Sequence, residues 1–225
     1  MHLRRICCAA AMGLLLVPAA RAQSRWYVSG SLGTYFRENE SGPEGITNHV
    51  VTGPGTATDT FDPGLLANLA VGYRLGAGLR LQAEAGYAQY QTATTNPQSA
   101  FFPPLKGQQF TRETGGGHTI LMGTLNLFYD LPVPGRFVPY IGGGLGGAHT
   151  ETQHSRFLDA SGNGFLEGGG ESTRGVALVE GGLNIALGAH AALVPAYRYL
   201  HFFGLSSSRG DEVAHIAKIG LRYSF

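Results

Sequence analysis

Apolar and polar residues alternate along the last thirteen residues of the chain. In Val213–Phe225 the odd-numbered positions are mostly apolar and end in aromatics, whereas the even-numbered positions are small or charged. Period-two alternation is typical of a β-strand whose two faces meet different surroundings. The pattern therefore predicts a terminal strand whose apolar face ends with Tyr223 and Phe225.

Seven further segments alternate in the same way, and each reaches the roughly 9–11 residues with which a tilted strand crosses a membrane. The eight predicted strands are Trp26–Phe36, Leu65–Leu75, Gly78–Gln91, His118–Leu131, Arg136–Thr150, Thr173–Leu187, His190–Phe203 and Val213–Phe225.

The connections between these segments alternate between short and long. Short ones are predicted at 76–77, 131–135 and 188–189. Long ones, which we expect to be loops, are predicted at Arg37–Gly64, Thr92–Gly117, Glu151–Ser172 and Gly204–Glu212. Barrels of the bacterial outer membrane have this asymmetry, with turns in the periplasm and loops outside the cell.

The N-terminus has the features of an export signal. Arg4 and Arg5 precede the apolar stretch Ile6–Ala20, and Ala20-Arg21-Ala22 places small residues where signal peptidase reads them. A membrane anchor is the alternative, but the stretch is short for a span of roughly 20 residues. We expect cleavage before Gln23.

The predicted domains are therefore a cleaved signal peptide at 1–22 and one barrel at 23–225. Cys7 and Cys8 leave with the signal, so the mature chain has no cysteine for a disulfide or a thiolate metal site. Without the three arginines of the signal, thirteen basic residues face fifteen acidic ones. This near balance argues against nucleic acid as a partner, which favours a basic surface.

Composition separates a membrane barrel from a soluble β-sandwich, which also shows alternating strands. The charged fraction is 14%, against about 25% in soluble domains. A sandwich would expose its polar face and carry more lysine there, yet Lys106 and Lys218 are the two lysines of the chain. The 35 glycines are also about twice the usual share. These features favour the membrane barrel.

Three motifs carry a family resemblance: Val138–Ala148, Ala196-Tyr-Arg-Tyr199 and Gly220-Leu-Arg-Tyr-Ser-Phe225. With them the chain resembles the porin-like outer-membrane barrels that include the opacity surface antigens and the membrane domain of outer-membrane protein A. The resemblance implies an all-β, eight-stranded antiparallel up-and-down transmembrane β-barrel in the bacterial outer membrane. It also implies contact with outer-membrane lipid and lipopolysaccharide. Periplasmic chaperones would deliver the chain, and the barrel-assembly machinery would read Tyr223 and Phe225 as an assembly signal.

If the apolar faces meet lipid, the opposite faces define the barrel interior. The predicted interior charge network is Arg74, Arg80, Glu84, Glu180, Arg198, Lys218 and Arg222. An unpaired charge there would cost several kcal/mol. We therefore expect Glu84 and Glu180 to be paired with Arg74, Arg198, Lys218 or Arg222. Two interpretations remain open: a packed polar core, and a switchable ion-pair gate in a narrow porin-like channel.

Catalytic chemistry finds little support in the sequence. A lipid A-modifying enzyme of the deacylase type needs a serine two positions from a histidine on one strand face, and the segments here lack that spacing. His149, Glu151 and His154 could bind a metal, but no fourth ligand is evident. We therefore expect no enzyme activity, catalytic residue, metal or cofactor. Any host or surface ligand would bind the long loops at Arg37–Gly64, Thr92–Gly117 and Glu151–Ser172.

Overall fold

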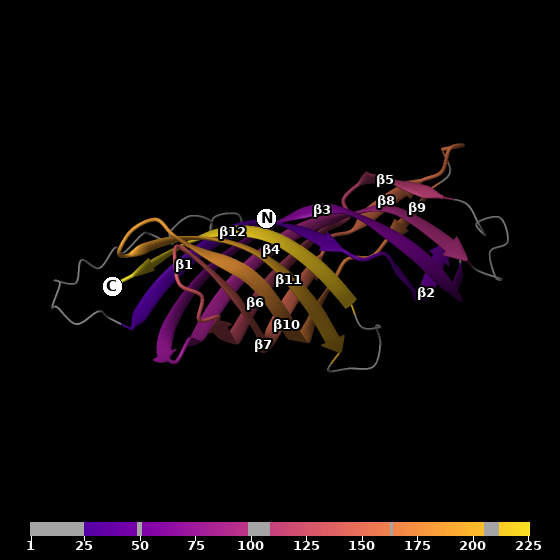
Figure 1. Cartoon of the computed structure of the whole chain (residues 1–225). Coiled ribbons are helices and arrows are strands. Elements are labelled where there is room, and N and C mark those ends of the chain that lie inside the picture. The colour runs from indigo at the N-terminus through magenta and orange to yellow at the C-terminus, as the bar shows by residue number, and fades with distance from the viewer. Residues whose placement is uncertain (1–24, 49–50, 99–108, 163, 205–211) are drawn as a thin grey trace, which may run out of the picture.

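The computed structural model is an all-β protein, described over residues 25–48, 51–98, 109–162, 164–204 and 212–225 (Figure 1). Eight strands form a closed antiparallel barrel in the order β3-β1-β12-β11-β10-β7-β6-β4, and pairing of β3 with β4 closes it. The predicted eight-stranded barrel is thus confirmed. The barrel strands are β1 (Trp26–Arg37), β3 (Val51–Gly76), β4 (Leu79–Gln98), β6 (Gly117–Asp130), β7 (Phe137–Thr152), β10 (Gly170–Ala186), β11 (Ala191–Gly204) and β12 (Glu212–Ser224).

Three of the expected long loops contain paired strands instead, so their prediction as irregular loops is wrong. Arg37–Gly64 includes a hairpin of β2 (Glu40–Asn48) with the start of β3, and Thr92–Gly117 includes the end of β4. The other new strands are β5 (Phe110–Thr114), β8 (Ser155–Leu158) and β9 (Gly164–Glu167). Threonine recurs in these segments, and its branched side chain favours extended backbone.

A β-bulge explains why the sequence predicts the start of the second strand only at Leu65. The register between β3 and β4 shifts between Asp62 and Leu65, across Pro63 and Gly64. Proline cannot donate a ladder hydrogen bond, and glycine commonly marks a bulge. Pro63 and Gly64, which in the sequence indicate a strand end, therefore mark an irregularity inside one 26-residue strand.

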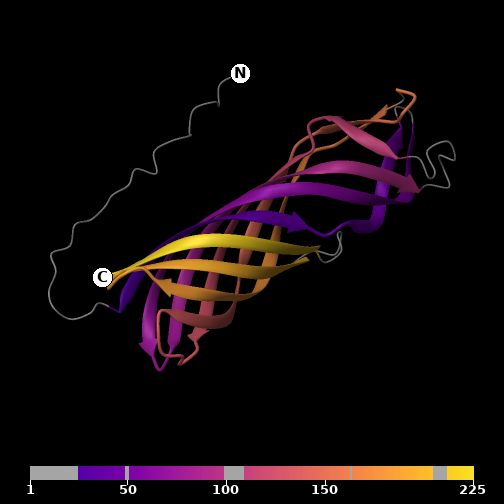
Figure 2. The same ribbon diagram turned by 45° about the horizontal axis from the view of Figure 1, so that its top comes forward.

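The extra strand length lies on one side of the barrel. Figure 2 shows β3 and β4 continuing well past the ends of β11 and β12. The sheet continues from β4 through β5 and β8 to β9, and from β3 to β2. The end with short turns carries both ends of the barrel, because β1 begins and β12 finishes there. We call the opposite end, with the long strands, the extracellular end, following the general architecture of such barrels.

The tightest turn lies between β3 and β4. Gly76, Ala77 and Gly78 all have positive φ, at 107°, 50° and 81°. Glycine adopts these angles without strain, whereas alanine does not. The two glycines therefore account for the turn, and Ala77 is its strained member.

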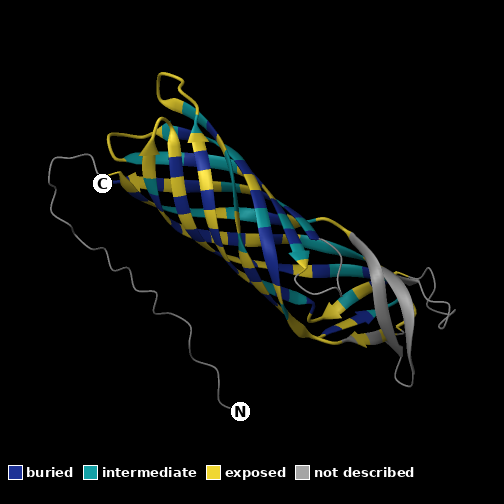
Figure 3. Cartoon of the chain, turned by 90° about the horizontal axis from the view of Figure 1, so that it is seen from below, coloured by how far each residue is buried: buried dark blue, intermediate teal, exposed yellow. Residues whose placement is uncertain are grey.

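Burial alternates along the barrel strands, as the banding in Figure 3 shows. On β6 every second residue from His118 to Phe128 is buried, and the residues between them from Leu121 to Tyr129 are mostly exposed. The exposed face is apolar and bears aromatics near its edges, as in the belts of membrane barrels. Exposed aromatics are Trp26, Phe36, Tyr87, Tyr129, Phe137, Tyr197, Tyr199, Tyr223 and Phe225.

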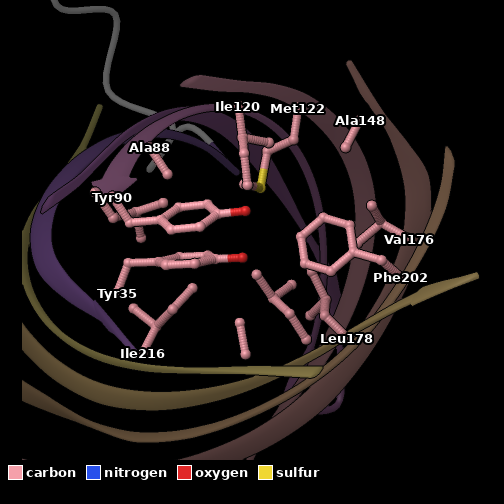
Figure 4. Packing of buried hydrophobic residues seen from close by; sticks show 13 residues of the cluster. Tyr35, Ala88, Tyr90, Ile120, Met122, Ala148, Val176, Leu178, Phe202 and Ile216 are labelled. Atoms are coloured by element: carbon pink, nitrogen blue, oxygen red, sulfur yellow. The ribbon is translucent and has the colours of Figure 1, made fainter. Parts of the chain in front are cut away.

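The buried face of the barrel wall encloses the core. Its largest apolar cluster contains 13 residues from all eight strands, and Figure 4 shows their side chains converging on the barrel axis. A smaller cluster of Phe128, Tyr140 and Val194 lies among the interior charges. Among the described residues no helix is long and apolar enough to cross a membrane.

Candidate functional site

The centre of the barrel interior holds a cluster of four charged side chains. The Arg198 guanidinium donates from Nη2 to Glu84 at 2.9 Å and from Nε to Glu180 at 2.7 Å. Lys218 Nζ lies 2.8 Å from Glu180 and 3.8 Å from Glu84. All four side chains are at least 94% buried. Two cations thus neutralise two carboxylates, and each carboxylate contacts both cations.

Neutral side chains complete the hydrogen bonds of this cluster. The Tyr140 hydroxyl donates to Glu180 at 2.7 Å, and Gln82 Nε2 donates to Glu84 at 3.1 Å. Buried carboxylates need such partners because an ion pair alone leaves oxygen lone pairs without hydrogen bonds. The cluster is therefore a well-satisfied polar core.

The β-sheet register and small residues bring these groups together. Glu180 on β10 is directly opposite Arg198 on β11, whereas Glu84 reaches the same guanidinium from β4. Gly142 and Gly144 on β7 face the interior without side chains. A Cβ on Gly144 would lie against the Asn126 amide, and one on Gly142 would overlap the Phe128 ring. The glycine-rich run on β7 thus leaves room for large interior side chains from β6.

A second polar network lies toward the end with short turns. Arg80 Nε donates to Asp130 at 2.8 Å, and Arg80 Nη1 donates to the Tyr27 hydroxyl at 3.0 Å. Tyr27 donates in turn to Gln82 at 3.0 Å, which links this network to the central cluster. Arg222 Nη1 donates to Asn184 at 2.6 Å. Six of the seven residues expected in the interior charge network therefore lie in two connected groups.

Arg74 is the seventh, and the structure does not bring it to the others. It lies at the exposed end of β3, and its Nη2 donates to the Ser224 hydroxyl at 2.8 Å. Arg74 shares the inward parity of Asn68, but it lies only two residues before Gly76, where β3 ends. The alternation of inward and outward positions alone does not show that Arg74 lies at the rim of the barrel.

An apolar layer separates the central cluster from the extracellular end. Tyr35 and Tyr90 stack with ring centroids 5.2 Å apart, and their hydroxyls point toward the axis in Figure 4. Ile120, Met122 and Phe202 pack around them, each at most 3% exposed. The layer fills the cross-section of the barrel with apolar and aromatic groups, as expected for an interior only wide enough for side chains.

A third charged group, which the sequence interpretation missed, lies beyond the apolar layer. Glu212 contacts Arg174 at 2.7 Å and Arg37 at 3.1 Å, and all three side chains are at least 92% buried. Arg37 also donates to the Tyr90 hydroxyl at 2.8 Å and lies 4.0 Å above the Phe61 ring. Arg37 and Glu212 lie in segments that the sequence predicts as loops, although each continues the two-residue period of its strand.

The described histidines His118, His149 and His154 have different hydrogen-bond partners. His118 is buried between the Thr92 and Thr152 hydroxyls, at 2.9 and 3.1 Å, and His149 bonds Thr173 on the surface. His154 accepts a hydrogen bond from the Gly169 amide. Across the described part of the chain, no three His, Cys, Asp or Glu side chains are grouped to hold a metal ion.

Tyr223 and Phe225, the expected assembly signal, point outward near the end of the chain. They are 50% and 44% exposed, and their rings meet edge to face with centroids 5.5 Å apart. The Phe225 amide donates to Trp26 O at 3.3 Å, beside the seam between β1 and β12. The two rings are thus presented together on the apolar belt.

Comparison with known proteins supports the same architecture. The family described as outer membrane protein beta-barrel domain matches residues 7–225. Neisserial surface protein A is similar in structure, with 15% identity, a TM-score of 0.52, and coverage of 90% of this chain and 98% of that one. OprG from Pseudomonas aeruginosa gives 17% identity, a TM-score of 0.48, and coverage of 90% and 96%.

The attachment invasion locus protein of Yersinia pestis gives 13% identity, a TM-score of 0.41, and coverage of 88% of this chain and 98% of that one. Among curated proteins, no sequence matches. At 15% identity, the likeness to Neisserial surface protein A shows a shared fold alone.

Proposed function

Because the chain belongs to the outer membrane protein β-barrel family and is a bacterial outer-membrane barrel, we propose that it is a non-enzymatic surface protein. Its barrel serves as a scaffold, and its extracellular strands bind a host or surface ligand through contact or adhesion. The observation that carries this proposal is the contrast between a filled interior and a tall extracellular sheet.

The filled interior supports a scaffold over an open pore. Along the barrel axis the central ion cluster is followed by the apolar layer around Tyr35 and Tyr90, and then by the Glu212 group. An ion passing through would have to separate buried ion pairs and cross an apolar layer without water. Both steps carry high free-energy barriers.

The extracellular sheet supports a contact role. On β4 the apolar belt reaches Tyr87, and the strand then continues to Gln98. On β3 the strand extends from Leu65 back to Val51. Exposed surface on strands anchored in a rigid barrel suits recognition, because the scaffold fixes the geometry of the contact.

The apolar belt and the end of β12 support three further partners in this proposal: outer-membrane lipid, lipopolysaccharide and the barrel-assembly machinery. The belt suits outer-membrane lipid and the acyl chains of lipopolysaccharide, since its exposed side chains are large and apolar. Tyr223 and Phe225 are offered together beside the seam, where the barrel-assembly machinery would read them after delivery by periplasmic chaperones.

A narrow channel is the second candidate, favoured by one feature of the central cluster. Both carboxylates contact Arg198 and Lys218, so a change of partner could shift the cluster without leaving a charge unpaired. Such an exchange would be the switch of a gate. The apolar layer would still have to open for conduction.

Planar-bilayer recording of the purified protein separates the two functions. We expect no steady channels from the wild type, and we expect binding to a host-cell or bacterial surface that is lost when residues 40–59 are deleted. This deletion removes a hairpin in which Glu40 is opposite Asp59. The Ala77→Gly variant, altered at the opposite end, is the matched control and should bind normally. Steady channels whose conductance changes when Glu84 or Glu180 is neutralised would contradict the scaffold function and support the channel.

A further inference from the structure

A small cavity inside the barrel lies beside Arg222. Its volume is about 30 Å³, and its lining includes Ser29, Ser31, Asn68, Lys218 and Arg222. A space of roughly 10–15 Å³ is enough for one water molecule, so this cavity can hold a small ion or ordered water. The lining mixes polar side chains, Glu84 and Glu180 among them, with the apolar Phe128 and Val194.

Arg222 is a buried cation whose charge no carboxylate offsets directly. Its Nη1 donates to the Asn184 amide oxygen, and its guanidinium lies 4.9 Å from the centre of the Tyr27 ring. Its Nε is buried without a hydrogen-bond acceptor. Among the described residues, no carboxylate oxygen lies within 4.0 Å of its nitrogens.

The neighbouring carboxylates are already engaged by other cations. Glu84 and Glu180, which also line the cavity, are shared between Arg198 and Lys218. Asp130 accepts from Arg80 at 2.8 Å and from the Asn184 amide nitrogen at 2.9 Å. The two connected networks therefore contain one more cation than carboxylates: Arg80, Arg198, Lys218 and Arg222 against Glu84, Asp130 and Glu180.

We propose that the cavity is a binding site for a small monovalent anion of the size of chloride. The anion accepts from Arg222 Nε and from the hydroxyls of Ser29 and Ser31, and it offsets the excess positive charge. Ser31 Oγ accepts a 3.4 Å hydrogen bond from Asn68, which leaves its own proton available. Water could accept the same hydrogen bonds but would leave the buried charge uncompensated.

Halide binding gives a direct test on the folded protein in detergent. Crystals grown or soaked in bromide should show an anomalous peak in the cavity within hydrogen-bond distance of Arg222 Nε. The thermal unfolding midpoint should also rise by a few degrees when chloride replaces gluconate, from about 10 mM to about 300 mM at constant ionic strength, because a ligand of the native state stabilises it by mass action.

Two variants make the test specific. Arg222→Gln removes the excess charge, so both the bromide peak and the chloride dependence should disappear. Arg136→Gln changes an exposed arginine that binds the Ala186 carbonyl at the short-turn end, and it should keep both. If Arg222→Gln does not fold, the bromide map of the wild type still shows whether an anion occupies the cavity. A cavity without bromide, or a midpoint that does not respond to chloride, would overturn the anion site.

Discussion

Tyr35 and Tyr90 stack across an intervening strand, because Gly64 lies between them without a side chain. Tyr35 on β1 is opposite Gly64 on β3, and β3 separates β1 from β4, which carries Tyr90. A Cβ on Gly64 would lie 2.1 Å from the Gln89 carbonyl oxygen and 2.7 Å from Tyr90 Cβ. The bulge at Pro63 and Gly64 thus forms the floor of the aromatic stack within the apolar layer.

We expect Gly64→Val to destabilise the barrel. The added side chain would overlap the β4 backbone and displace Tyr90, and overpacking of this kind costs about 1–3 kcal/mol. Urea unfolding of the protein in lipid vesicles would measure the loss. Gly30→Ala is the matched control, since a Cβ there meets Leu69 at an ordinary 3.5 Å. Equal stability of the two variants would contradict a close approach at Gly64.

Alternation in the sequence is sufficient to predict the eight barrel strands and, for six of them, residues that face inward. The period of two is a local property, and it persists wherever one face meets lipid and the other a packed interior. For this reason Glu84, Glu180, Arg198 and Lys218 could be assigned to the interior, although the contacts between them come from strands far apart in sequence.

Strand ends were harder to predict, since they depend on pairing with distant partners. The extracellular part of β4 pairs with β3 and, near Thr94, with β5, so its extension rests on neighbours outside the local pattern. Polar residues such as Thr94 and Thr95 occupy both faces there, so the apolar alternation that marks a membrane strand ends. The same limit hid the Glu212 group, because Arg37 and Glu212 are terminal residues of β1 and β12 at the extracellular end.

Arg198→Met should be strongly destabilising. Among the described residues it leaves Lys218 as the one cation within 4.0 Å of Glu84 and Glu180. Breaking a buried pair by removing one partner costs about 3–5 kcal/mol. Arg74→Met alters the exposed arginine at the rim and should change the unfolding midpoint little. The midpoint of the heat-dependent shift on a denaturing gel gives a rapid comparison. A small effect of Arg198→Met would show that the cluster rearranges readily, which would favour the channel.

Glu212→Gln should also destabilise, although its position was expected to be in a loop. The change removes a buried carboxylate that both Arg37 and Arg174 contact, and breaking a buried pair by removing one partner costs about 3–5 kcal/mol. Glu171→Gln is the control, because that carboxylate is 70% exposed and lies 3.9 Å from His149. Guanidinium unfolding followed by tryptophan fluorescence would report both variants through Trp26, the single tryptophan. Similar midpoints would mean that the Glu212 group contributes little.

The end of β12 leads to a prediction about assembly and not about stability. Phe225 is 44% exposed on the apolar belt, so its ring contributes little to the packed interior. Deleting Phe225, or changing it to Asp, should leave export intact and lower the amount of heat-modifiable barrel in the outer membrane, because Tyr223 would then lose the ring that it meets edge to face. Phe225→Tyr retains the aromatic ring and should assemble normally. Barrel yield can be compared with total exported protein by fractionation. A Phe225 deletion that inserts at the wild-type yield would show that the insertion machinery does not read this residue.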